Sequence, residues 1–209
     1  MKILMQNQIA KILLEIKAVK LSIDPPFTWA SGIKSPIYCD NRMLMGYPAK
    51  RKIVIDAFAE KVKEYNPEII AGTATAGIPH AAWIAEKLEL PMIYIRSKKK
   101  NHGRQNQIEG PLEKGKKVLV IEDLISTGGS SVEAAKAVQE AGGEVLGVLA
   151  IFTYQLNKSF EVFKEANIKF ETLTNFETLI NIAVEQNYLD EKDKETVLAW
   201  YKDPQNWLN

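Results

Sequence analysis

The strongest chemical signal in this sequence is an apolar run that ends in two acids and then turns through small and hydroxyl-bearing residues. The segment reads VLVIEDLISTGGSS from Val118 to Ser131. The apolar run predicts a buried strand, and ligands of open α/β sheets bind at the carboxyl ends of strands. The backbone N–H groups of the turn and of the helix that follows suit a phosphate group, whereas the carboxylates of Glu122 and Asp123 suit sugar hydroxyls or a metal ion. The alternative is an N-capped helix after an ordinary strand, but capping requires neither paired acids nor two glycines.

A second signal is a cluster of positive charges in a long polar connection. The segment Arg96–Arg104, RSKKKNHGR, carries five cationic side chains and a histidine, and no acid occurs before Glu109. Such a density of charge suits a diphosphate that gains charge as it leaves. A solvated, charged loop is the alternative interpretation. The position of residues 97–115 between two apolar strands favours a functional loop, one that can close over a site and exclude water.

Predicted strands and helices alternate along most of the chain around these two segments. Short, nearly continuous apolar runs alternate with helical segments from residue 49 onward, which indicates an α/β fold with a mostly parallel, doubly wound sheet. The sequence predicts helices over 51–65, 80–88 and 131–141, and strands over 68–72, 92–96, 118–123, 145–152 and near 170–173. Before this core, it predicts a helix over 8–19 and two short strands, 27–30 and 37–40, that form a small cap; helices end the chain.

Together these segments resemble the type I phosphoribosyltransferases, and among them the orotate phosphoribosyltransferases. The strand, acid pair and turn are similar to the family's motif for phosphoribosyl diphosphate (PRPP), and Arg96, Lys100, His102 and Gly103 have the spacing of its catalytic loop. Residues 27–38, FTWASGIKSPIY, resemble the family's cap segment, and Gly77-Ile78-Pro79 matches another of its motifs. The resemblance covers residues 27–149. It implies the type I phosphoribosyltransferase fold with one domain over 1–209, in which 1–46 form the cap, or hood, and 97–115 a flexible catalytic loop.

The resemblance also implies the activity and the roles of residues. The expected reaction transfers the 5-phosphoribosyl group of PRPP to N1 of orotate and gives orotidine 5'-monophosphate and diphosphate, in de novo pyrimidine (UMP) biosynthesis. Lys100, His102 and Asp123 are expected to be catalytic, and Ser126 to contact orotate. The residues expected to bind PRPP are Arg96, Lys99, Lys100, His102, Glu122, Asp123, Leu124, Ile125, Ser126, Thr127, Gly128, Gly129 and Ser130. Mg²⁺ is expected as cofactor, held mainly through PRPP and water rather than by protein ligands.

Four positions depart from the family's pattern, and one of them is Ser97, which takes the place of a frequent loop lysine. Many orotate enzymes have a lysine in the cap segment and another before Gly-Ile-Pro, where this chain has Ala30 and Ala76, and a site arginine is replaced by Tyr154. The sequence therefore leaves open how the carboxylate of orotate is held. A phosphoribosyltransferase for a purine base, or a regulator that binds PRPP without turnover, are the alternative functions.

Composition restricts the location and partners. The chain has 27 Lys and Arg against 26 Asp and Glu, which disfavours binding of nucleic acid. Cys39 is the only cysteine, so neither an intramolecular disulfide nor a cysteine-based metal site can form, and we expect it to be a core residue. No run of about 18 apolar residues occurs, and the N-terminal segment lacks the pattern of a signal peptide, so the expected location is the cytoplasm, away from membranes. The resemblance implies a homodimer whose catalytic loop is shared between subunits. Separately, His80 lies early in a predicted helix and is expected to have a structural rather than a catalytic role.

Overall fold

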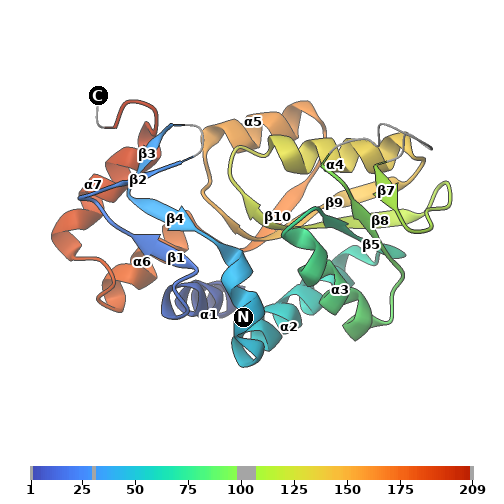
Figure 1. The fold of residues 1–209 in the computed structure, drawn as a ribbon, viewed down its shortest axis with the longest axis horizontal. Helices are drawn as coiled ribbons and strands as arrows, with labels where there is room; N and C mark the ends of the chain where they lie inside the picture. The colour runs from blue at the N-terminus through green and yellow to red at the C-terminus, as the bar shows by residue number, and fades with distance from the viewer. Residues whose placement is uncertain (1, 30–31, 98–106, 208–209) are drawn as a thin grey trace. The chain divides into compact units, whose positions relative to one another are not determined.

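The computed structural model describes residues 2–29, 32–97 and 107–207, and within these ranges the chain forms two units (Figure 1). One unit combines residues 1–47 with residues 174–209, and the other consists of residues 48–173. The second unit contains both chemical signals of the sequence. The prediction of a single domain with a cap over 1–46 stays a prediction.

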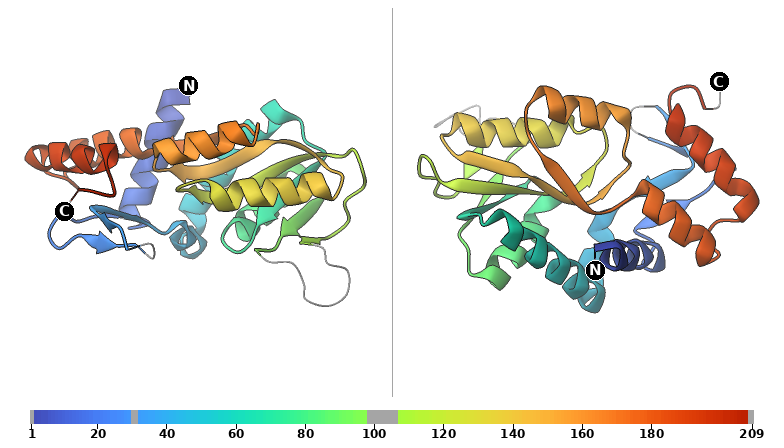
Figure 2. Two further views of the ribbon diagram at one scale, coloured as in Figure 1. Left: turned by 90° about the horizontal axis from the view of Figure 1, so that it is seen from above. Right: turned by 180° about the vertical axis from the view of Figure 1, so that it is seen from behind.

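The second unit is built on a six-stranded sheet. Its strands are β5 (Ile69–Thr73), β6 (Met92–Ile95), β7 (Ile108–Glu109), β8 (Lys117–Ile125), β9 (Glu144–Thr153) and β10 (Phe170–Asn175), in the order β10-β9-β8-β5-β6-β7. The pairs β5–β6, β5–β8 and β8–β9 are parallel, and β7 lies antiparallel to β6. The helices α2 (Pro48–Tyr65) and α3 (Gly77–Leu88) cover one face, and α4 (Gly129–Glu140) and α5 (Asn157–Glu165) cover the other (Figures 1 and 2). The expected mostly parallel, doubly wound α/β sheet is confirmed.

The apolar strands and helix faces explain why this sheet forms. All five residues of β5 are buried, as are Val118–Glu122 of β8, because helices cover both faces of the sheet. On α4, the buried residues Val132, Ala135 and Val138 recur every three residues and face the sheet. These strands and α4 share one hydrophobic core with Phe163 of α5.

The first unit joins the two ends of the chain. Its elements are α1 (Lys2–Glu15), β1 (Val19–Leu21), β2 (Phe27–Thr28), β3 (Lys34–Ser35), β4 (Ile37–Cys39), the 3₁₀ helix η1 (Asn41–Gly46), α6 (Phe176–Glu185) and α7 (Glu191–Lys202). Helix α1 packs on α6. The indole N–H of the fully buried Trp200 in α7 donates to the Lys34 carbonyl oxygen at 3.0 Å, and its ring meets that of Trp29 edge to face. The C-terminal helices therefore complete the core of the N-terminal segment.

Three predicted elements differ from the structure. The helix expected over 8–19 begins at Lys2 and ends at Glu15, because Lys17 takes a left-handed conformation with φ of 56° and Val19 enters β1. The two predicted cap strands are shorter than expected, at Phe27–Thr28 and Ile37–Cys39, and each pairs with a strand that was not predicted, β2 with β3 and β4 with β1. The connection 97–115 is not wholly irregular, because Ile108 is buried in the core and places β7 on the sheet edge.

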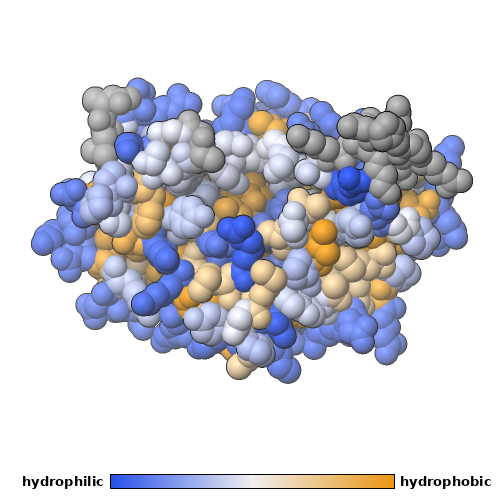
Figure 3. Space-filling model, viewed as in Figure 1, coloured by the Kyte–Doolittle hydropathy of each residue, from blue (hydrophilic) through white to orange (hydrophobic). Residues whose placement is uncertain are grey.

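Apolar side chains are mostly buried in the described part of the chain. On the face drawn in Figure 3, hydrophilic residues predominate and apolar residues show between them. The large apolar side chains that are exposed are Ile3, Leu4, Tyr38, Met43, Met45, Tyr47, Tyr94, Phe160 and Tyr188. Among the described residues, no helix has both the length and the hydropathy that crossing a bilayer requires.

Candidate active site

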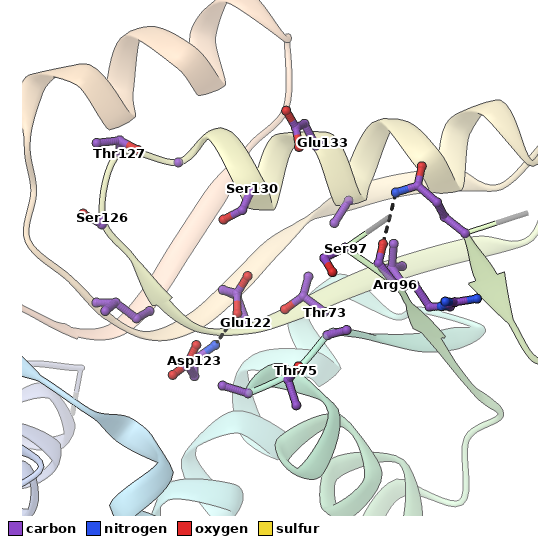
Figure 4. A pocket seen from close by; sticks show the side chains of 17 residues that line it. Thr73, Thr75, Arg96, Ser97, Glu122, Asp123, Ser126, Thr127, Ser130 and Glu133 are labelled. Atoms are coloured by element: carbon purple, nitrogen blue, oxygen red, sulfur yellow. Dashed lines mark hydrogen bonds between the residues drawn. The ribbon is translucent and has the colours of Figure 1, made fainter. Parts of the chain in front are cut away.

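A cavity of about 310 Å³ opens where strands β5, β6 and β8 end and helix α4 begins (Figure 4). Because these strands are parallel, their carboxyl ends meet at one edge of the sheet, where ligands of such folds bind. The volume is that of a site for a small molecule. The cavity is lined by Thr73, Ala74, Thr75, Ala76, Ile95, Arg96, Ser97, Gln107, Glu122, Asp123, Leu124, Ser126, Thr127, Gly128, Ser130, Glu133 and Ala134.

The turn between β8 and α4 forms one wall. Ser126, Thr127 and Ser130 line the cavity, and the first N–H groups of a helix have no acceptor within that helix. The turn depends on Gly128, which has a φ of 84°, and a Cβ at this position would lie 2.9 Å from Cε2 of the Phe163 ring. A glycine is therefore required for both the conformation and the close approach. Together with the positive end of the α4 dipole, these groups suit a phosphate.

The acid pair ends β8 beside this turn. Glu122 is almost fully buried, with 8% of its surface exposed, and accepts the backbone N–H of Asp123 at 3.0 Å through Oε1. Burial, followed by the neighbouring Asp123 carboxylate, raises the pKa of Glu122 to about 8. A buried carboxyl of this kind is expensive to ionise unless a ligand or a hydrogen-bond donor stabilises the charge. Vicinal hydroxyls of a ribose can supply such donors.

The end of β5 forms the opposite wall. Residues 73–76 pass from β5 into α3, and the Ala74 N–H donates to the Ile95 carbonyl oxygen at 2.8 Å. A Cβ on Gly77 would lie 2.5 Å from both the Ile121 carbonyl oxygen and Thr73 Oγ1, so the glycine allows α3 to begin directly against β8. The sequence analysis assigned none of these four residues to the site, and it named Ala76 only as a departure from the family's pattern. The sequence feature that could have identified residues 73–76 is their position between the end of a buried strand and Gly77-Ile78-Pro79.

Arg96 brings a positive charge to the rim at the end of β6. Its guanidinium Nη1 lies 3.6 Å from Glu109 Oε1. Its backbone is fixed in both directions, because its N–H donates to the Gln107 carbonyl oxygen at 2.9 Å and its own carbonyl accepts Gln107 Nε2 at 3.0 Å. The described segments on either side of residues 98–106 therefore meet at the edge of the cavity. Three residues expected to bind PRPP, Lys99, Lys100 and His102, lie outside the described residues.

Most of the other expected site residues surround this one cavity. Arg96, Glu122, Asp123, Leu124, Ser126, Thr127, Gly128 and Ser130 all line it. Ile125 is fully buried in the core, and Gly129 is the first residue of α4; neither lines the cavity. Glu133, one turn further along α4, lines it and was missed because it reads as an ordinary surface residue of a helix.

Residues set aside on the sequence lie elsewhere. His80 is buried in α3 against the Trp83 ring, and burial, followed by the charge of Arg51, lowers its pKa to about 4. Cys39 is buried in β4, as expected, with its thiol 3.4 Å from Asn41 Oδ1. Tyr154 is buried with its ring edge to face on Phe152 and does not line the cavity.

Comparison with known proteins gives consistent matches over nearly the whole chain. The family model of the phosphoribosyl transferase domain matches residues 46–186. The chain is 56% identical over 204 residues to an orotate phosphoribosyltransferase of Listeria monocytogenes serotype 4b, which covers 97% of this chain and 98% of the relative. It is 59% identical over 203 residues to an orotate phosphoribosyltransferase of Enterococcus faecalis, with 96% and 97% covered. The crystal structure of orotate phosphoribosyltransferase from Aeropyrum pernix matches with a TM-score of 0.73 and 25% identity over 86% of this chain and 98% of that one.

Proposed function

The chain belongs to the phosphoribosyl transferase family, among its orotate phosphoribosyltransferases, and we propose that its cavity transfers the 5-phosphoribosyl group of PRPP to N1 of orotate. The observation that carries the assignment of the site is the meeting of two chemistries in one cavity. The hydroxyl and glycine turn of residues 126–130 suits the 5-phosphate, and the Glu122–Asp123 pair beside it suits the ribose hydroxyls.

In this reaction the bond from the anomeric carbon to the diphosphate oxygen breaks, and its electrons leave on the oxygen. N1 of orotate forms the new bond to that carbon and releases its proton. The ribose passes through an oxocarbenium-like state, so the protein must align N1 with the carbon and neutralise the departing oxygens. We assign neutralisation to Arg96 and to Lys99, Lys100 and His102 of the cationic loop, and alignment of the ribose to the acid pair; Ser126 contacts orotate.

Mg²⁺ fits this site as an ion bound largely through the substrate. The diphosphate, the ribose hydroxyls and water would supply most ligands, because Mg²⁺ usually keeps several waters and takes few protein ligands. When bound, the ion neutralises charge on the diphosphate. The carboxylates of Glu122 and Asp123 would hold the ribose hydroxyls.

We further propose a cytoplasmic homodimer in which the cationic loop of one subunit reaches the cavity of the other. Mixing a loop variant, Lys100→Ala, with an acid-pair variant, Asp123→Asn, should restore part of the activity, since a hybrid dimer holds one intact site. No recovery, after mass spectrometry has confirmed subunit exchange, would contradict the shared site.

The loss of orotate absorbance on addition of PRPP tests the function directly. The proposal requires a loss that depends on PRPP and Mg²⁺, with one diphosphate released per orotate consumed, and adenine, guanine and hypoxanthine should not compete. If PRPP binds in calorimetry but orotate is not consumed, the assignment of orotate as the base is refuted. If PRPP does not bind, the assignment of the cavity as the PRPP site is refuted.

Substitution of Lys100 tests the loop. We expect Lys100→Ala to lower kcat/KM by at least about 100-fold, the scale of removing one charged donor from a transition state. A value within a few-fold of the parent enzyme would refute the assignment of the loop.

A further inference from the structure

Glu122 is surrounded by side-chain hydroxyls from two other elements. The parallel register pairs Gly72 of β5 with Ile121 of β8, so the next residues, Thr73 and Glu122, are neighbours on adjacent strands. Figure 4 shows the Thr73 hydroxyl directed toward the Glu122 carboxyl. Its one proton is donated to the Ile121 carbonyl oxygen at 3.0 Å, so it donates to the carboxyl only by sharing that proton or by turning it toward the acid. From the other side, the Ser131 hydroxyl donates to Glu122 Oε2 at 3.4 Å.

Thr73 is held firmly in this position. It is 4% exposed, and its Oγ1 donates to the Ile121 carbonyl oxygen at 3.0 Å. The start of α3 closes over it, since even one added carbon at Gly77 would lie 2.5 Å from that hydroxyl. A side chain with so little room keeps one rotamer, so the hydroxyl is a fixed point against which the Glu122 carboxyl can be oriented.

Ser131 connects the acid to the turn. It lies in the first turn of α4, directly after the residues assigned to the 5-phosphate, and is 1% exposed. The 3.4 Å contact is longer than an ordinary O–H···O hydrogen bond, and such contacts in unliganded sites commonly shorten when the ligand binds. The acid and the turn, which would hold two parts of one substrate, are thereby linked by a hydrogen bond.

We propose that Thr73 and Ser131 are positioning residues that hold the Glu122 carboxyl in the orientation in which it receives the ribose hydroxyls of PRPP. Neither residue is among those that the sequence analysis assigned to the site. The inference rests on the proposed function only in taking PRPP as the ligand. It makes no assumption about how orotate binds.

Positioning of the Glu122 carboxyl matters because a glutamate side chain is flexible. The side chain has three rotatable bonds, and ordering it on ligand binding is entropically unfavourable. Contact with the fixed Thr73 side chain and the hydrogen bond from Ser131 restrict the carboxyl in advance and remove part of this penalty. A hydroxyl proton donated to the acid also stabilises the ionised form that accepts hydrogen bonds from the ribose. Loss of either hydroxyl should weaken PRPP binding without changing how the base binds.

The test measures KM for each substrate and the Kd of PRPP for Thr73→Val and Ser131→Ala. We expect Thr73→Val to raise the KM and Kd of PRPP about 10-fold, and Ser131→Ala, whose 3.4 Å contact is long for an O–H···O hydrogen bond, about 3-fold. KM for orotate should change less than about two-fold, and Thr73→Ser should restore PRPP binding because it keeps the hydroxyl.

A matched control separates positioning from general loss of stability. Tyr65→Phe also removes a hydroxyl bonded to a carboxylate, that of Glu171 at 2.8 Å, but neither residue lines the cavity, so KM for PRPP should not change. The second control is the Glu122→Ala background, in which Thr73→Val and Ser131→Ala should leave the Kd of PRPP unchanged if both act through this carboxyl.

Several outcomes would overturn the inference: unchanged PRPP affinity in both variants, an equal rise in KM for orotate, or effects that persist in the Glu122→Ala background. If Thr73→Val fails to fold, Ser131→Ala and Thr73→Ser decide the question. A parent enzyme that binds PRPP but does not consume orotate refutes the proposed base, and the PRPP titrations still test the inference. A parent enzyme that binds no PRPP refutes both.

Discussion

Replacing Gly128 by alanine should destabilise the protein, whereas the same change at Gly129 should not. The added Cβ at Gly128 would stand 2.9 and 3.1 Å from two carbons of the Phe163 ring, and the residue has a φ of 84°. The left-handed conformation costs a residue with a Cβ about 1–2 kcal/mol, and overpacking of a buried site costs about 1–3 kcal/mol. The two effects together predict a loss of about 2–5 kcal/mol in the free energy of unfolding.

Gly129 provides the matched comparison. A Cβ there has no atom within 4 Å, and the residue begins α4, where alanine is a better helix former than glycine. Thermal unfolding followed by circular dichroism should give a Tm lower by roughly 5–15 °C for Gly128→Ala, and a Tm unchanged or slightly higher for Gly129→Ala.

A double variant identifies which contact is responsible. Phe163→Leu shortens the opposing side chain, so Gly128→Ala should be less destabilising by about 1–3 kcal/mol in that background than in the parent. Equal Tm values for the two glycine variants, or full additivity with Phe163→Leu, would refute the argument that the turn is built around the Phe163 ring.

Two further substitutions test the electrostatics. The lowered pKa of His80, about 4 against an ordinary 6.5, means that the unfolded chain binds a proton that the folded chain does not, so stability falls by roughly 3 kcal/mol as the pH drops from 6.5 to 4. Urea unfolding of His80→Phe should lack this part of the pH dependence, and an unchanged slope would assign it to other groups. Arg96→Gln should raise the Kd of PRPP about 10-fold at low salt and less at high salt, because one cation is removed from the rim. Calorimetry should show no such change for Lys116→Gln, whose ion pair with Glu68 lies outside the cavity lining, and equal effects of the two substitutions would contradict a specific role for Arg96.

The parts of the site that could be predicted from sequence are those whose chemistry is local. The strand, acids and turn over 118–131 follow one another along the chain, and each has a distinctive residue type, so the motif predicts its own geometry. Thr73 carries no such signal. It reaches the cavity only because β5 and β8 are parallel with Gly72 beside Ile121, and a register between strands this far apart has no local pattern.

The same reason explains the differences in the fold. A two-residue strand such as Ile108–Glu109 is too short for any periodicity, and it forms because the sheet edge accepts it. The packing of Trp200 against Lys34 joins positions near opposite ends of the chain, and an isolated tryptophan does not identify its neighbour. What the sequence could not predict is thus mainly the pairing of distant segments.

The discontinuous composition of the first unit also has a consequence for synthesis on the ribosome. Residues 48–173 are a continuous stretch, so this unit can fold as soon as the nascent chain has passed its last strand. Residues 1–47 emerge earlier but must wait for 174–209 to provide α6 and the tryptophan of α7. If the sheet forms first, it already holds the chain between these two segments, which lowers the entropic penalty for bringing them together. During translation, the first unit is therefore the last part of the protein to complete its core.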